Sequence, residues 1–187
     1  MKRCLTVVLH VLILALVPIA ALAQEASIKA ASITNSPSHL QINIKLINTF
    51  SPEMDEAIRT GIPTSFEYLI LLYRHHSFTN DKLLTSVTVT KTIKYNTLKQ
   101  EYVVTEGSTV NGTSSLVLTS LEEAKKVMNS VKVPFYPMWK LERNESYYVK
   151  IKAQSRGVEP PGYVDFILFF MNWMNFETDW VIEKFFY

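Results

Sequence analysis

A period-two alternation of apolar and polar residues constrains the fold of this chain more than any other feature. The segment Leu40–Leu46 places leucine or isoleucine at every second position, and Val87–Tyr95 shows a similar pattern. Because successive side chains of a strand point to opposite faces, each segment predicts a strand with one buried face. The run Phe66–Tyr73 is apolar at nearly every position, which predicts a central strand covered on both faces.

Further patterns predict most of the remaining sheet. Residues 84–96 and 98–105 are predicted to form a hairpin, and residues 146–153 alternate as another strand. Residues 179–187 predict a last strand that closes the sheet. The segment Thr105–Ser115 is rich in Gly, Ser, Thr and Asn, which predicts a long exposed loop.

Two short helices are expected between the strands. The segment Ser51–Glu53 supplies an N-cap, a first-turn proline and a first-turn acid, and Gly61 ends that helix. A capping box at Ser120 begins a second helix, whose apolar stripe continues until Pro134. The predicted fold is therefore mainly β (α+β), an antiparallel β-sandwich or partly closed barrel of about seven strands with two or three short helices.

The N-terminus predicts export. Lys2 and Arg3 precede an apolar stretch, and Ala21-Leu22-Ala23 follows it as a small-residue exit site. This order is typical of a secretory signal peptide. We expect cleavage after Ala23, which leaves residues 24–187 as a single exported, periplasmic domain. Retention of the segment as an anchor is the alternative.

Composition excludes several classes of function. Once Lys2 and Arg3 leave with the signal, 17 basic residues face 17 acidic ones, so no basic stripe favours nucleic-acid binding. The only cysteine, Cys4, lies in the signal, which excludes disulfides, thiol catalysis and zinc–thiolate sites. No phosphate loop, dinucleotide fingerprint, G-x-S-x-G or H-E-x-x-H motif occurs. We therefore expect neither a cofactor nor a metal.

The aromatic run Phe166–Trp180 is the most distinctive feature of the C-terminal third. Part of it, Val164–Met174, predicts a buried helix or strand. Exposed aromatic surface marks binding sites, whereas buried aromatic residues fill the core, and both interpretations stay open. The candidate residues for binding a ligand or partner in this region are Phe169, Trp173, Phe176, Asp179 and Trp180.

A second candidate site lies at the end of the central strand. Arg74 and His76 share a face, so His76 could act as a base or ligand beside the guanidinium group. His75 points to the opposite face, so His75 and His76 cannot both bind one ion from regular β geometry. The alternative is that both histidines are strand-end residues near the surface.

Several segments, taken in order, resemble the bacterial family of exported proteins called domain of unknown function 4390. They are Leu46–Phe50, Ser51-Pro52, Ala57-Ile58, Gly61-Ile62-Pro63 before Phe66, Tyr95, Leu98, Tyr102-Val103-Val104, Ser120-Leu121-Glu122-Glu123-Ala124, Pro160-Pro161, Trp173 and Asp179-Trp180. One departure is Phe78, at a position where a tryptophan is expected. The resemblance implies an exported envelope protein and carries no assigned activity.

Three hypotheses of function follow. The first is a non-enzymatic binding or accessory module that engages another envelope protein or an apolar ligand. The second is a carboxylate-based, hydrolase-like enzyme that uses Asp165, Glu177 and Asp179, with or without a histidine. The third is a membrane-associated structural protein of the envelope, with peripheral membrane association.

Overall fold

The computed structural model describes residues 25–157 and 175–187. Three strands form one sheet: β1 (Ser27–Asn35), β2 (His39–Ile47) and β7 (Ser130–Pro137). Six strands form the other: β3 (Thr64–Arg74), β4 (Lys82–Asn96), β5 (Glu101–Ser108), β6 (Gly112–Leu118), β8 (Ser146–Gly157) and β9 (Val181–Phe186). The helices are α2 (Pro52–Arg59) and α3 (Leu121–Met128), and a 3-10 turn, η1, covers Met138–Lys140.

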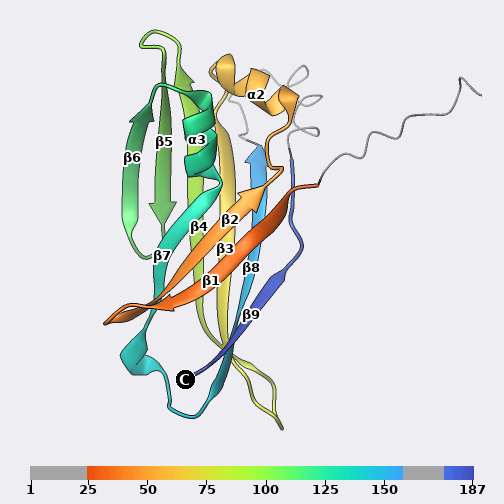
Figure 1. Cartoon of the computed structure of the whole chain (residues 1–187), viewed down its shortest axis with the longest axis vertical. Coiled ribbons are helices and arrows are strands. Elements are labelled where there is room, and N and C mark those ends of the chain that lie inside the picture. Colours follow the sequence, from red (N-terminus) through yellow and green to blue (C-terminus); the bar gives the residue numbers. More distant parts are fainter. Residues whose placement is uncertain (1–24, 158–174) are drawn as a thin grey trace, which may run out of the picture.

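Both sheets are antiparallel throughout. The strand orders are β1-β2-β7 and β6-β5-β4-β3-β8-β9. Figure 1 shows the three-stranded sheet crossing in front of the six-stranded one, with α2 and α3 at one end. The fold is thus mainly β and sandwich-like, as the alternation predicted, and β3 is central because it pairs with β4 and β8.

The core lies between the two sheets. The inward positions of β2 and β3 are almost inaccessible to solvent: Leu40, Ile42, Ile44, Leu46, Phe66, Tyr68, Ile70 and Leu72. The outward positions of β3 differ from the prediction, because Leu69, Leu71 and Tyr73 are half-buried rather than buried. The apolar run in β3 therefore supplies the core on one side and a partly exposed apolar surface on the other.

The two predicted helices are present. The Ser51 hydroxyl accepts a hydrogen bond of 3.2 Å from the Met54 N–H, which caps α2 as predicted. Gly61 follows at a φ of 91°, a conformation that favours glycine. For α3, the predicted capping box is wrong in part, because the Ser120 side chain makes no capping hydrogen bond.

Two predicted segments are corrected. The second helix does not continue until Pro134. It ends at Met128, and Val131, Val133 and Phe135 then alternate as buried residues of β7. The period-three spacing of Met128 and Val131 concealed this change, and Pro134 is tolerated because β7 is an edge strand.

The segment Thr105–Ser115 is a hairpin rather than a long loop. Strand β5 continues to Ser108, which pairs with Gly112 at the start of β6. Gly112 has a φ of 74°, so the three residues between them suffice for the reversal. Strand β1 was not predicted, since a register shift between Ile28 and Ala30 breaks its period-two pattern.

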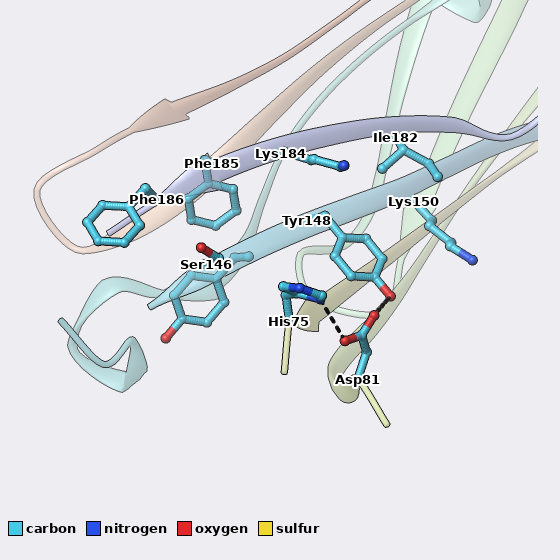
Figure 2. A pocket seen from close by; sticks show the side chains of 10 residues that line it. His75, Asp81, Ser146, Tyr148, Lys150, Ile182, Lys184, Phe185 and Phe186 are labelled. Atoms are coloured by element: carbon cyan, nitrogen blue, oxygen red, sulfur yellow. Dashed lines mark hydrogen bonds and ion pairs between the residues drawn. The ribbon is translucent and has the colours of Figure 1, made fainter. Parts of the chain in front are cut away.

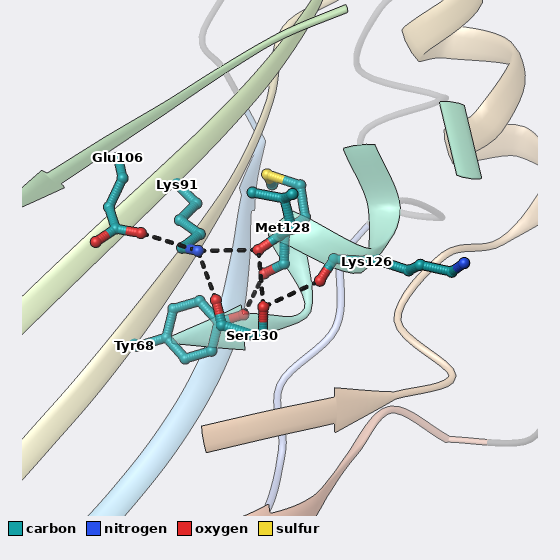
Figure 3. A network of polar contacts seen from close by, with 7 residues as sticks. Tyr68, Lys91, Glu106, Lys126, Met128 and Ser130 are labelled. Carbon is teal, nitrogen blue, oxygen red and sulfur yellow. Dashed lines mark hydrogen bonds and ion pairs between the residues drawn. The ribbon is translucent and has the colours of Figure 1, made fainter. Parts of the chain in front are cut away.

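A buried polar cluster ties the sheets together where α3 meets β7 (Figure 3). The ammonium group of Lys91 donates hydrogen bonds to the carbonyls of Val127 and Ser130, and it pairs with Glu106 at 2.9 Å. The Tyr68 hydroxyl donates to the Met128 carbonyl. Carbonyls at the end of a helix lack partners within it, and a nearby cation suits the negative end of the helix dipole. Lys91 and Tyr68 therefore supply hydrogen-bond donors to the carbonyls at the C-terminus of α3.

Two sequence predictions lie outside the described residues. These are the signal segment 1–23 and the buried helix or strand of residues 164–174. In the ranges 25–157 and 175–187, none of the helices has the length and apolar character needed to span a membrane.

Lys91→Met is expected to lower the free energy of unfolding by about 2–4 kcal/mol, because it removes the buried ammonium group that donates to the carbonyls of Val127 and Ser130 and pairs with Glu106. Chemical denaturation measures this change. Lys94→Met is the matched control, since Lys94 is exposed on the same strand. Equal effects of the two substitutions would contradict a structural role for the buried ammonium group.

Candidate functional site

The candidate site lies on the outer face of the six-stranded sheet, over β3, β8 and β9. The strand register aligns Tyr73 with Tyr148, and Tyr148 with Lys184. Two residues further along each strand, the register aligns Leu71 with Lys150, and Lys150 with Ile182. Cross-strand neighbours of this kind lie within contact distance. The face therefore combines aromatic, aliphatic and basic side chains in neighbouring rows.

Aromatic rings and lysines are in direct contact on this face. The rings of Tyr73 and Tyr148 stack with centroids 5.1 Å apart, and Lys150 Nζ lies 5.8 Å from the Tyr73 centroid. Lys152 Nζ lies 5.4 Å from the ring of Trp180 and also pairs with Glu177. Such cation–π contacts hold the lysine stems against the sheet.

A groove of about 700 Å³, half open to solvent, runs along this face. It is lined by His75, Asp81, Ser146, Tyr147, Tyr148, Lys150, Ile182, Lys184, Phe185 and Phe186. Figure 2 shows His75 and Tyr148 meeting at the carboxylate of Asp81. The groove thus has a hydrogen-bonded polar group beside apolar side chains and two ammonium groups.

Asp81 organises the polar end of the groove. Its carboxylate accepts hydrogen bonds from the His76 N–H at 3.0 Å and the Tyr148 hydroxyl at 2.8 Å, and it pairs with His75 Nδ1 at 2.9 Å. The bond from the His76 N–H, followed by that from Tyr148, lowers the pKa of Asp81 to about 2. Desolvation and the Asp81 carboxylate raise the pKa of Tyr148 to about 12. At neutral pH the site therefore holds an ionised Asp81 and a protonated Tyr148.

The contact between His75 and Asp81 has the geometry of an acid–base pair, in which a carboxylate orients an imidazole ring. A hydrolase of this type also needs a nucleophile hydrogen-bonded to the other ring nitrogen. Among the described residues no hydroxyl makes that bond, although Ser146 lines the same groove. In the described part of the chain, the His75–Asp81 pair therefore lacks a hydrogen-bonded nucleophile.

The charge of the groove is positive. Lys150 and Lys184 form no ion pair with any described residue, whereas Asp81 is already paired. Because the two lysines belong to adjacent rows of neighbouring strands, their ammonium groups border one stretch of the groove. An anionic group beside an apolar one is the ligand chemistry that these residues match.

The structure brings Arg74 and His76 together, as their shared face predicted. Arg74 Nε donates to His76 Nε2 at 3.2 Å, and the guanidinium group also pairs with Glu142. Neither residue lines the groove, because alternation places His75 rather than His76 on the outer face. In the described part of the chain, no three His, Cys, Asp or Glu residues are grouped so as to hold a metal ion.

The aromatic candidates divide between core and surface. Phe176 packs edge-on against Phe66 with centroids 4.8 Å apart, so it joins the core. Trp180 is 43% exposed and lies over Lys152. Phe169 and Trp173 lie outside the described residues.

The carboxylates proposed for hydrolysis form no described cleft. Glu177 is exposed and paired with Lys152, and Asp179 is exposed. Thr178 between them is buried, where its hydroxyl accepts a hydrogen bond from the Ala153 N–H at 3.1 Å. Neither carboxylate lines the groove, and Asp165 lies outside the described residues.

Sequence reasoning missed the residues that build the groove: Asp81, Tyr148, Lys150, Ile182 and Lys184. Residues 146–153 were predicted as an alternating strand, and its polar half carries a tyrosine and two lysines. These polar positions of the strand could have indicated the site. The sequence did not predict that β8 pairs with both β3 and β9, so it could not show which side chains of the three strands lie next to one another.

Comparison with known proteins gives a family but no function. A family model described as a domain of unknown function, DUF4390, matches residues 23–183. No curated protein and no solved structure matches the chain. The matched range includes all of β1 to β8 and the first half of β9.

Asp81→Asn is expected to change how stability depends on pH. A carboxyl group whose pKa is lowered in the folded state stabilises the fold above its ordinary pKa and loses that contribution as pH falls through the folded value. The difference in free energy of unfolding between wild type and Asp81→Asn should therefore be constant above about pH 5 and narrow between about pH 4 and pH 2. Urea denaturation across this range measures it. A difference that does not change with pH would contradict the pairing.

Proposed function

Since this chain belongs to the DUF4390 family, which shares a domain of unknown function, we propose its role from its surface: it is an exported, non-enzymatic binding module of the cell envelope. Its outer sheet face binds an acidic, partly apolar segment of another envelope protein. The groove over β8 and β9 is the binding site, and Lys150 and Lys184 select the charge of the partner.

One observation carries the proposal, namely large apolar side chains exposed beside two lysines that form no ion pair with any described residue. Ile182 is 48% exposed and Phe186 67% exposed, and both line the groove that Lys150 and Lys184 border. Exposed aromatic surface of this kind is costly in water and is typical of interaction sites. The unpaired ammonium groups add a preference for negative charge and faster association.

The shape of the groove favours a protein segment over an enclosed small ligand. Pockets for small apolar ligands bury most of the ligand surface. This groove is half open, and its floor consists of side chains from neighbouring strands, which alternate along a straight line. An extended segment that alternates acidic and apolar residues would match that spacing.

Export rests on the N-terminal sequence. The order of Lys2-Arg3, an apolar stretch and Ala21-Leu22-Ala23 supports a cleaved signal, and the family match begins at residue 23. The lack of cysteine in residues 24–187 is compatible with an oxidising compartment, where the domain must rely on packing.

Cell fractionation of a Gram-negative host that expresses the full gene is expected to yield a soluble periplasmic product. The intact mass should correspond to a chain that begins at Gln24. A product that keeps residues 1–23, or that stays with membranes through a high-salt wash, would contradict the proposal and favour an anchored or membrane-associated protein.

Site-specific photo-crosslinking tests the groove. A photoreactive residue at Ile182 is expected to capture an envelope protein through an acidic segment, which mass spectrometry of the crosslinked peptide identifies. The double charge reversal Lys150→Glu with Lys184→Glu should reduce capture at least about tenfold, because each reversed pair costs roughly 1 kcal/mol or more.

A photoreactive residue at Lys132 is the matched control, since Lys132 is exposed on the other sheet. Capture at Ile182 that is no stronger than at Lys132, or that survives charge reversal, would refute the groove as the binding site. Capture of a basic or uncharged segment would have the same consequence.

A further inference from the structure

The two most exposed aromatic side chains among the described residues lie at one end of the sandwich. Phe78 is fully exposed in the loop between β3 and β4, and Trp139 is 77% exposed in η1, between β7 and β8. Figure 1 shows both connections at the end of the molecule opposite α2. Neither side chain lines the groove of the proposed binding site. We call the segments that carry them, residues 75–82 and 138–145, the tip.

An ion pair and two hydrogen bonds hold these connections side by side. Arg74, the last residue of β3, pairs with Glu142, which follows η1. Tyr147 on β8 accepts a hydrogen bond from the Glu142 N–H at 2.9 Å and donates one to the Glu142 carbonyl at 3.2 Å. Because β8 also pairs with β3, the connection through η1 is fixed against the end of β3. Phe78 and Trp139 are therefore presented together by two anchored connections.

Three exposed cations accompany the aromatic residues. Lys82 begins β4 directly after the loop, and Lys140 and Arg143 follow Trp139 in the chain. Lys140 Nζ lies 5.2 Å from the centroid of the Trp139 ring. None of the three cations forms an ion pair with a described residue. Their charge is thus available to an anionic partner.

The acidic side chains of the tip do not balance these cations. Two of the three are already paired, Asp81 with His75 and Glu142 with Arg74. The third, Glu145, is half-buried and forms no ion pair with a described residue. Three cationic side chains without an ion pair therefore face one such carboxylate, which gives the tip a positive charge.

We propose that the tip docks on the surface of a bilayer that contains anionic phospholipids. The rings of Phe78 and Trp139 enter the region between the headgroups and the acyl chains, where aromatic side chains are enriched in membrane proteins. Lys82, Lys140 and Arg143 lie beside them, at the level of the lipid phosphates. This contact does not use the groove and goes beyond the binding module proposed above.

The arrangement of the tip favours a bilayer over a protein partner. Aromatic residues that anchor a protein interface cluster at its well-packed centre. Phe78 and Trp139 instead project from separate connections, each of which also carries an exposed cation. A lipid surface is deformable and has its phosphates next to apolar chains, so it accommodates separate rings and neighbouring cations without a matching pocket.

The attachment is reversible. Even a single acyl chain binds a bilayer only marginally, and two aromatic rings offer no more than a comparable apolar anchor. Salt screens the attraction between the cations and the lipid phosphates, so a high-salt wash should release the protein. The tip is thus compatible with the soluble product expected from cell fractionation.

Co-sedimentation with lipid vesicles tests the tip. The full gene is expressed, and wild type and variants are purified in the same form, so that any contribution of the N-terminus is equal in all of them. Wild type should bind vesicles of equimolar phosphatidylglycerol and phosphatidylcholine at least about tenfold more tightly than vesicles of phosphatidylcholine alone. The double substitution Phe78→Ser with Trp139→Ser should weaken binding to the anionic vesicles about tenfold or more, because it removes both rings.

Each half of the interaction has a matched control. Leu98→Ser controls for the rings, since Leu98 is 95% exposed between β4 and β5 at the opposite end of the sandwich, and it should leave binding unchanged. Lys140→Glu with Arg143→Glu should weaken binding about tenfold or more. Lys126→Glu with Lys132→Glu changes the net charge equally on α3 and β7, away from the tip, and should have a smaller effect.

Several outcomes would overturn the proposal. Wild type that does not bind the anionic vesicles, or that binds both kinds of vesicle equally, contradicts it. So do tip variants that bind like wild type, and control variants that lose as much binding as the tip variants. None of the substituted residues lines the groove, so a failure here leaves the proposed protein-binding site unaffected.

Discussion

The structure depends on the ammonium group of Lys91 on the large sheet. This group lies at the connection between helix α3 and strand β7 of the small sheet. Residues 127–130 lead from the last turn of α3 into the start of β7. Lys91 on β4 and Tyr68 on β3 both donate to carbonyls of these residues, so two strands of the large sheet hold the connection. From the other side, Asn129 accepts hydrogen bonds from the Leu46 N–H and from the Thr49 hydroxyl. This short connection thereby fixes the position of the small sheet relative to the large one.

The contacts that join the two sheets use inward-facing side chains, so the outward-facing side chains of the large sheet remain at the surface. Strand β3 has apolar residues on both faces, but its inner half alone fills the sandwich. Tyr73, Leu71 and their neighbours on β8 and β9 contribute little to that core. The hydrogen bonds of Asp81 instead keep the loop after β3 against Tyr148, which gives the groove a fixed end. The site is therefore a consequence of sheet order together with one loop carboxylate.

The parts of the fold that sequence reasoning predicted depend on local periodicity. Segments 40–46, 66–73 and 87–95 alternate or run apolar because each has at least one buried face, and that signal needs no knowledge of partners. It failed at β1, where a register shift breaks the period, and at β7, where helical and strand spacings coincide around Val131. The periodicity also assigned no role to Lys91, which lies in phase with the buried residues Val89 and Ile93. Its acceptors lie 36 and 39 residues away, so no local pattern could reveal them.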